Sequence, residues 1–380
     1  MEEMIKNHVL RFLPAKSLYR FKSVSKSWNR WISSPFLAHQ QSTHFTKTSG
    51  FFFSDDRHYH YPFFIPLHPP SNGVPVPSLS FLPVPVTIRA TSHGLLCCQT
   101  IFPDITYFLC NPATEEWTKL PDPMLFHSPD SSAIALHFSP STYNFQSHFQ
   151  IVCAVPSDSL KAVFFEIYSS RTNSWRVADS EYFYDDDQEL AFRGDGFCVD
   201  GFAYWEASNG IALGFDLKYE QHGEIRLPPG HGEEGALVEM DGELCYIMPQ
   251  KEENGCYNLG VYGGLNMVLK RQIPLDFGDL RIIDGDDDGE VMMIRVLSCV
   301  NDGRVVVILV GANNVVLYDV GEGKGISLVK RVVGCGPTGR GDSRRCLPYI
   351  NSLAGVCPVE KMPAEDHHVI AEVLENMSFD

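Results

Sequence analysis

The sequence predicts a mainly β protein with a small all-α module at its N-terminal end, and the β body is predicted to be a propeller of about six blades. Apolar residues between positions 9 and 36 recur three or four residues apart, which is helical spacing. From about residue 87 onward, short apolar runs alternate with turn residues instead. A strand–turn–strand pattern also returns about every 50 residues, which is typical of propeller blades.

The helical segment is amphipathic and too short to form a core of its own. Its basic positions are Lys16, Arg20, Lys22, Lys26 and Arg30, and its apolar positions are Leu18, Phe21, Val24, Trp28, Trp31 and Ile32. So small a unit must bury its large side chains against another surface. On pattern alone, that surface is either the chain's own sheet or a partner.

Charge divides the chain into two parts. Residues 1–50 carry eight Lys or Arg and two Asp or Glu, a net charge of +6, whereas the whole chain has −17. This asymmetry indicates two modules with different roles, and the acidic body argues against binding to nucleic acid or to an anionic membrane. No apolar run approaches the roughly 18 residues of a membrane span, and Met1-Glu2-Glu3 is unlike a signal peptide. We therefore expect a soluble protein of the cytoplasm or nucleus.

The repeat in the body is weak but regular. Leu109–Trp117 and Ile167–Trp175 each combine a strand, a turn and a closing tryptophan, and shorter echoes follow near residues 215, 261 and 317. Counted from Asn111 through Ser169, Asp216, Gly263 and Asp319, the spacings are 58, 47, 47 and 56 residues. Residues 50–355 would then hold about six units. Five or seven blades, and a Greek-key sandwich, remain alternatives.

The segments that flank the propeller are expected to differ from it. Residues 42–90 form a connection rich in proline and aromatic residues, with first strands such as Phe51–Phe53, and its prolines exclude long helices. The propeller itself is assigned to residues 91–360. Residues 361–380 are expected to form a C-terminal amphipathic helix that begins near Pro363.

We find no motif that predicts catalysis or a metal site. Asp284-x-Asp286-x-Asp288-Gly289 opens like a calcium loop, but Arg295 stands at the twelfth position, where a carboxylate is required. His58-x-His60 and His367-His368 lack further ligands at a recognisable spacing. The eleven cysteines are odd in number and contain no Cys-x-x-Cys, so free buried thiols are expected. We expect no catalytic residue, metal or cofactor.

The helical segment resembles a known family. Leu13-Pro14-x-Lys16-Ser17-Leu18-x-Arg20-Phe21-Lys22-x-Val24-Ser25-Lys26-x-Trp28, followed by Ile32-Ser33-Ser34-Pro35-Phe36, is similar to the second half of an F-box. Family members usually open with Leu-Pro and an acidic residue, whereas this chain starts at Met1-Glu2-Glu3-Met4, inside the first helix. The resemblance implies a module over residues 1–41, shortened at its start, that docks on the Skp-type adaptor of a cullin–RING ubiquitin ligase.

The body resembles the F-box-associated domain of plant F-box proteins, which is a kelch-like β-propeller. The resemblance rests on Ser92-His93-Gly94-Leu95-Leu96-Cys97, on Cys110–Thr114 with Trp117 and Leu120-Pro121, and on Tyr168–Arg176. It implies a non-catalytic substrate-recognition subunit of an SCF-type ligase, which holds the adaptor, through it a cullin, and an unknown target protein. Alternatives are a ligase-independent scaffold and an enzyme or small-molecule sensor that uses the propeller channel.

The F-box resemblance also implies which side chains contact the adaptor. These are Leu13, Pro14, Leu18, Phe21, Val24, Ser25 and Trp28, whereas Trp31 and Ile32 are expected to pack toward the chain's own body. Target-binding residues are expected in surface loops, because propellers bind partners through loops. The candidate loops are Asp122–Pro129, Tyr182–Glu189 and Gly334–Arg345.

Overall fold

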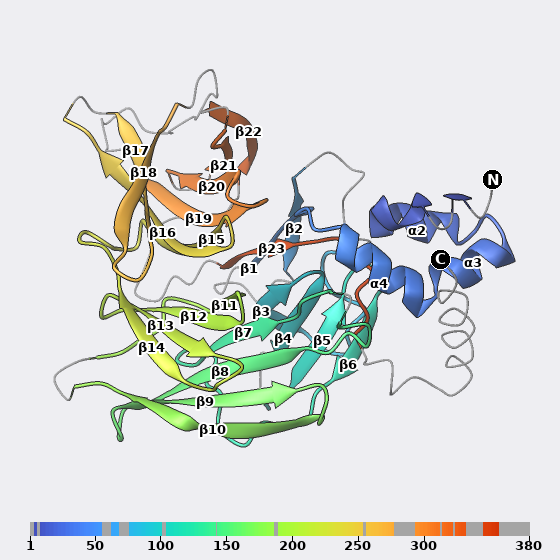
Figure 1. Ribbon diagram of the computed structural model, residues 1–380, viewed down its shortest axis with the longest axis horizontal. Coiled ribbons are helices and arrows are strands. Elements are labelled where there is room, and N and C mark those ends of the chain that lie inside the picture. The colour runs from blue at the N-terminus through green and yellow to red at the C-terminus, as the bar shows by residue number, and fades with distance from the viewer. Residues whose placement is uncertain are drawn as a thin grey trace.

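The computed structural model describes residues 4–5, 8–54, 62–67, 76–100, 104–141, 143–185, 189–253, 256–276, 293–311, 314–321, 324–331 and 345–356. The expected C-terminal helix over residues 361–380 lies outside them. The chain begins with the helices η1 (Leu10–Phe12), α2 (Ala15–Phe21), α3 (Lys26–Ile32) and α4 (Pro35–His44). They gather at one end of the molecule, and all remaining described elements are strands (Figure 1).

Serine caps define where α3 and α4 begin. The Ser25 hydroxyl accepts a hydrogen bond from the Trp28 amide at 3.1 Å and starts α3, and Ser34 does the same for α4 through the Leu37 amide at 3.3 Å. Pro35 occupies the first turn of α4, where its missing N–H costs nothing. These caps satisfy amides that a short helix would otherwise leave unpaired.

The strands form six antiparallel sheets. Five are consecutive four-stranded meanders, and the sixth joins β1 and β2 to the last strand, β23. The bounds are β1 (Gly50–Ser54), β2 (Phe63–Pro66), β3 (Val86–Ser92), β4 (Leu95–Thr100), β5 (Tyr107–Asn111), β6 (Glu116–Lys119), β7 (Ala133–His137), β8 (Gln150–Ser157), β9 (Ala162–Ser169), β10 (Ser174–Phe183), β11 (Phe197–Val199), β12 (Phe202–Ala207), β13 (Ile211–Asp216), β14 (His222–Arg226), β15 (Ala236–Met240), β16 (Glu243–Lys251), β17 (Tyr257–Gly263), β18 (Val268–Pro274), β19 (Ile294–Val300), β20 (Val305–Val310), β21 (Asn314–Asp319), β22 (Lys324–Arg331) and β23 (Arg345–Tyr349).

The six sheets are the blades of a closed propeller, which confirms the predicted fold class and blade number. The innermost strands of neighbouring blades lie side by side, β3 with β7, β7 with β11, β15 with β19, β19 with β23 and β23 with β3, and the third and fourth meanders meet where β12 packs beside β15. The ring closes where β23 pairs antiparallel with β1, with Phe52 opposite Leu347. Radial closure of this kind leaves only the short outer strands of the blades as sheet edges.

The sequence repeat marks one position in five successive blades. Asn111, Ser169, Asp216, Gly263 and Asp319 are the last residues of β5, β9, β13, β17 and β21, which are the third strands of their blades. Each precedes the turn into the outermost strand. The period therefore reports blade geometry rather than a binding motif.

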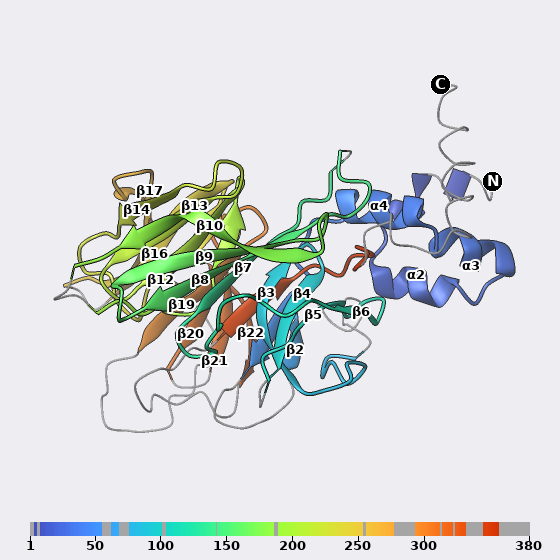
Figure 2. The same ribbon diagram turned by 90° about the horizontal axis from the view of Figure 1, so that it is seen from below.

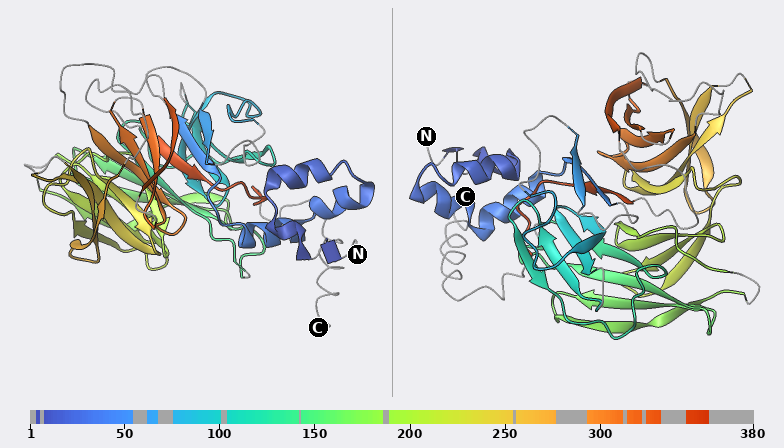
Figure 3. Two further views of the ribbon diagram at one scale, coloured as in Figure 1. Left: turned by 90° about the horizontal axis from the view of Figure 1, so that it is seen from above. Right: turned by 180° about the vertical axis from the view of Figure 1, so that it is seen from behind.

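The propeller has two faces, and the helices lie on one of them. In an antiparallel meander, the connections after the first and third strands lie at one end, and those after the second and fourth lie at the other. Thr114 follows a third strand and Phe145 a first strand, and both contact the helices. We call this the proximal face and the opposite one the distal face. Figures 2 and 3 show the helices as a lobe beside the propeller, with α4 nearest to it.

The described cysteines are free thiols, and most of them are buried. Burial raises the pKa of the Cys198 thiol to about 12 and that of Cys346 still further. A thiol that stays protonated is a poor nucleophile, so these residues act as small apolar core side chains. Among the residues that the structure describes, no helix has the length and apolarity that a membrane span requires.

Candidate functional site

The helices are fixed to the propeller through a shared apolar core. The fully buried residues Leu10, Ala15, Leu18, Ile32 and Leu37 pack together with Ala113 and Leu353 of the propeller. Trp31 packs against this cluster, so both Trp31 and Ile32 face inward as the sequence predicted. The helical module thus buries one side on its own chain.

Gln41 in α4 makes the central polar contact of this joint. Its side chain is fully buried, its Nε2 donates to the Leu13 carbonyl at 3.1 Å, and its Oε1 accepts from the Leu353 amide at 2.8 Å. The Ala15 amide donates to the Asn351 carbonyl at 3.3 Å. The segment 350–356, which follows β23, is therefore tied to the helices and not only to the blades.

Electrostatic contacts add a second attachment at the β5–β6 turn. The Tyr19 hydroxyl donates to the Thr114 carbonyl at 2.9 Å, and the Lys22 ammonium lies 4.1 Å from the centre of the Tyr19 ring. Burial lowers the pKa of Lys22, and Glu116 partly offsets this. The basic helices thus rest on an acidic turn of the propeller, which favours this orientation.

The opposite side of the helical module remains open at the α2–α3 turn. Phe21 is 36% exposed and Val24 is 61% exposed, and Trp28 is partly buried. The Phe21 and Trp28 rings meet edge to face with their centroids 5.8 Å apart. We call Phe21, Val24 and Trp28 the apolar edge. It groups three of the side chains that the F-box resemblance assigned to the adaptor.

The other assigned residues have different surroundings. Leu18 is fully buried in the shared core, three residues from Ala15 on the same face of α2, so it offers no accessible surface to a partner. Leu13 and Pro14 are partly buried, and Ser25 is exposed but serves as the cap of α3. Adaptor contact by the accessible members of the set stays a prediction.

Two further exposed apolar side chains lie at the start of the helical module. Val9 is exposed, and so is Phe12, whose ring packs on His44 with centroids 5.4 Å apart. Their three-residue spacing is the signal that could have identified them from sequence. They extend the surface that the helices offer to a partner.

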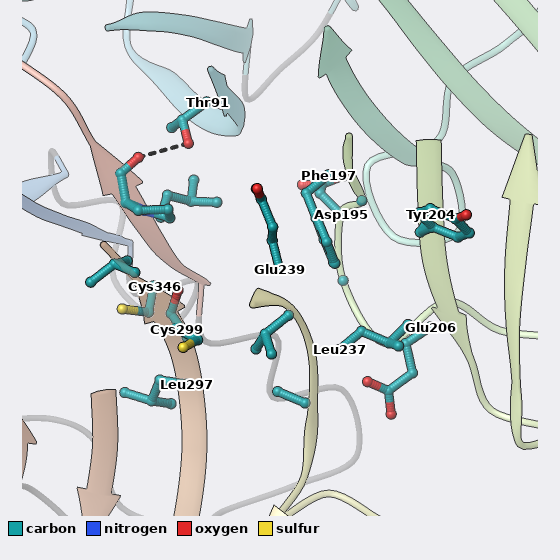
Figure 4. Close-up of a pocket in the computed structure, with 18 of the residues that line it drawn as sticks. Thr91, Asp195, Phe197, Tyr204, Glu206, Leu237, Glu239, Leu297, Cys299 and Cys346 are labelled. Carbon is teal, nitrogen blue, oxygen red and sulfur yellow. Dashed lines mark hydrogen bonds between the residues drawn. The ribbon is translucent and has the colours of Figure 1, made fainter. Parts of the chain in front are cut away.

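The propeller encloses a cavity of about 1700 Å³ along its axis. Figure 4 shows Glu239 pointing into it, between Thr91, Cys299 and Cys346 on one side and Asp195 and Phe197 on the other. Burial raises the pKa of Glu206 to about 7, although Arg193 opposes this from 3.0 Å. Within the described ranges, no three histidine, cysteine or acidic side chains converge as a metal site. His58, His60, His367, His368 and the segment 284–289 lie outside those ranges.

A chain of buried polar groups runs from the cavity wall into the first two meanders. Asp195 binds the Arg89 guanidinium at 2.9 Å and accepts from the Ile134 amide at 3.0 Å. Burial lowers the pKa of Arg89, but the carboxylate of Asp195 outweighs this and raises it. Arg89 also donates to Gln99, which in turn donates to Tyr107 at 3.1 Å. The network is saturated with internal partners, which is typical of a structural role.

A helical module with an open apolar edge, held rigidly on a closed propeller, defines a binding protein built from two recognition modules. Comparison with known proteins assigns both modules. Residues 5–39 match the F-box domain, and residues 75–254 match the F-box associated beta propeller domain. The chain thus carries an F-box followed by an F-box-associated propeller, an arrangement that it shares with plant F-box proteins.

Three proteins of Arabidopsis thaliana are similar to it. F-box protein At5g49610 is 29% identical over 272 residues, covering 63% of this chain and 69% of the relative. F-box protein At5g07610 is 27% identical over 290 residues, covering 67% and 64%. F-box protein At5g18160 is 24% identical over 259 residues, covering 63% and 61%. The matched region is therefore less than two thirds of the length of the last two relatives.

Proposed function

We propose that this protein is the substrate-recognition subunit of an SCF-type cullin–RING ubiquitin ligase. In this proposal, the F-box binds a Skp-type adaptor, and through it a cullin, while the propeller binds a target protein. The observation that carries the proposal is the apolar edge, where Phe21 and Val24 are exposed beside the partly buried Trp28 while the core of the helical module is buried against the propeller. Exposed apolar clusters of this kind typically mark an interface.

The surroundings of the apolar edge favour a partner with an acidic rim. Arg20, Lys26 and Arg30 are all exposed on α2 and α3, close in sequence to the apolar edge. A basic rim around an apolar centre speeds association with an acidic surface and disfavours basic ones. The apolar contacts would then supply most of the affinity.

The proposed mechanism is proximity rather than covalent catalysis by this chain. A receptor that holds a target beside a charged conjugating enzyme raises the effective concentration of the target's lysines. The Gln41 joint supports this role, because a fixed angle between helices and propeller preserves the distance between adaptor and target. We also propose that the protein acts in the cytoplasm or nucleus, where its free thiols stay reduced.

Adaptor co-purification with surface variants tests this function. Leu13 and Trp28 pack against the shared core, so replacing them would confuse unfolding with loss of contact. Phe21→Ser combined with Val24→Asp changes exposed side chains only, and we expect it to weaken adaptor binding at least about 30-fold, equivalent to about 2 kcal/mol. Val268→Asp on β18 is the matched control, since Val268 is 59% exposed.

The result has two clear readings. Loss of the adaptor in the double variant, with binding kept in the control and the same thermal unfolding midpoint, supports the proposal. Equal adaptor binding by all three proteins overturns it and leaves the ligase-independent scaffold as the better description.

A further inference from the structure

The loop between β6 and β7 on the distal face (residues 120–132) is held from within by a buried carboxylate. Glu166 of β9 accepts hydrogen bonds from the Met124 amide at 2.6 Å, the Leu125 amide at 2.9 Å and His127 Nε2 at 2.9 Å. Glu166 and His127 are both fully buried. One carboxylate thus fixes three residues of a surface loop, Met124, Leu125 and His127.

Aromatic neighbours fix the same loop from two other sides. The His127 ring lies 5.6 Å from the Tyr107 ring and 5.3 Å from the Trp175 ring, centroid to centroid. Trp175 Nε1 donates to the Pro121 carbonyl at 2.7 Å, at the start of the loop. The backbone of the loop is therefore ordered before any partner arrives.

This rigid loop presents two large apolar side chains to solvent. Met124 is 70% exposed and Phe126 is 76% exposed, whereas His127 beside them has no exposure. Leu160, in the β8–β9 turn on the same face, is also exposed. Burial of a Phe or Met side chain against a partner is favourable, because it removes apolar surface from water. A pre-ordered loop would keep most of that gain on binding, because little backbone entropy remains to be lost.

The charge on the distal face is strongly one-sided. Among the described residues of its connections, the basic side chains are Lys161 and Arg193. The acidic ones, apart from Asp195, which is buried and paired with Arg89, are Asp104, Asp122, Asp130, Asp158, Asp185, Glu189, Glu233, Glu234, Glu252, Glu253 and Asp276.

The proximal face is much closer to balance. The described acidic residues of its connections are Glu115, Asp200, Glu220, Asp241 and Asp302, against Arg171, Lys218 and Arg304. Among the described connections, the negative charge is thus concentrated on the face away from the F-box, where Met124 and Phe126 are displayed. Such a field attracts a basic partner and repels an acidic one.

We propose that the distal face, centred on Met124 and Phe126, binds a polypeptide segment of the target in which Lys or Arg residues flank large apolar side chains. The apolar side chains of that segment pack on Met124 and Phe126, and its cations face Asp122 and Asp130 at the two ends of the loop. The identity of this segment as part of a ligase target rests on the proposed function, whereas the binding chemistry does not.

Selection from a random peptide library tests the proposal. Displayed peptides of about 12 residues are selected on the full-length chain, and their affinities are measured by fluorescence anisotropy. We expect the selected peptides to combine Lys or Arg with large apolar residues. They should bind Met124→Ser with Phe126→Ser at least about tenfold more weakly, a loss of about 1.4 kcal/mol. Asp122→Asn with Asp130→Asn should weaken binding about threefold and flatten its salt dependence.

Matched controls come from the proximal face. Leu265 in the β17–β18 turn is 83% exposed, and Asp200 lies in the β11–β12 turn. Leu265→Ser and Asp200→Asn should leave peptide affinity within twofold of the original chain. All substituted side chains are exposed, and their replacement keeps the backbone amides that Glu166 binds. Unchanged unfolding midpoints verify that every variant is folded.

Four results would overturn the proposal. Two of them concern the selection, which would yield either no peptide or peptides without net positive charge. The third is an unchanged peptide affinity of the Met124/Phe126 variant. The fourth is self-association of the original chain that is lost in this variant, because a second copy of the chain would then be the occupant of the distal face. Adaptor binding by the original chain, measured in parallel with peptide binding, separates the two claims. Peptide binding without adaptor binding would contradict the proposed function alone, and the reverse would contradict only this inference.

Discussion

The Oε1 atom of Gln41, in the last turn of α4, accepts a hydrogen bond at 2.8 Å from the amide of Leu353, which lies 312 residues later in the chain. The other end of the same side chain donates to Leu13, at the start of the F-box helices. A single buried amide thus connects the first helices, the last helix and the end of the propeller. The two modules are joined through a buried contact, so the apolar edge and the distal face keep a fixed relation.

Replacement of Gln41 by leucine should loosen this joint. The substitution leaves the Leu13 carbonyl and the Leu353 amide buried without partners, and each typically costs about 1–3 kcal/mol. We expect faster hydrogen exchange in residues 10–44 and 350–356, while the blades exchange as before. Gln40→Leu is the control, since no residue in the described ranges hydrogen-bonds the Gln40 side-chain oxygen. Equal exchange in both variants would show that the joint does not depend on Gln41.

Tyr349 tests closure of the ring. Its buried ring packs 5.3 Å from Phe52 and 5.9 Å from Phe64, centroid to centroid, and its hydroxyl donates to Asn111 at 3.1 Å. Tyr349→Ala should lower the free energy of unfolding by about 3–5 kcal/mol, as for other large buried aromatics. Tyr143→Ala, at a residue that is 99% exposed, should change it by less than about 0.5 kcal/mol. Urea unfolding measures both, and similar values would argue against closure through β23.

Protonation of Glu166 should lower the free energy of unfolding at acid pH. Burial raises the pKa of this carboxyl, but hydrogen bonds from His127, Met124 and Leu125 outweigh it and lower the pKa below its ordinary value. The stabilising contribution of the Glu166 carboxylate is therefore fully present above the pKa of about 4.5 that this group has in the unfolded chain. It is lost as the pH falls through the lower pKa that the group has in the folded chain. The stability difference between the original chain and Glu166→Gln should be constant near neutrality and shrink below about pH 4.5. A pH-independent difference would contradict the assigned shift.

Glu206 in the cavity should titrate with the opposite sign. Its pKa is raised to about 7, mainly by burial, with Arg193 opposing. The folded chain therefore binds more protons than the unfolded chain, and stability from this group falls as the pH rises from about 4.5 to about 7. NMR of the labelled carboxyl carbon should give a midpoint near 7, and a midpoint near 4.5 would show that water reaches Glu206 freely.

The sequence was sufficient to predict the fold because its signals are local. Helical spacing around Phe21 and Val24, and turn residues after each third strand such as Asn111, reflect contacts between near neighbours. Pairing of Phe52 with Leu347 could not be predicted, because no local pattern encodes a contact between the two ends of the chain. Leu18 shows the same limit, since periodicity identifies an apolar face but not whether it meets the chain itself or a partner. A carboxylate inside the apolar run of β9, Glu166, was the available signal for the pinned loop.

The affinity of the full-length chain for a Skp-type adaptor tests the central claim most directly. Titration calorimetry should give a dissociation constant below about 1 μM, or about −8 kcal/mol, for the original chain and for Val268→Asp. Phe21→Ser with Val24→Asp should be at least about 30-fold weaker at unchanged stability. A constant weaker than about 10 μM for the original chain, or no difference between the variants, would contradict the assignment of this F-box to a ubiquitin ligase.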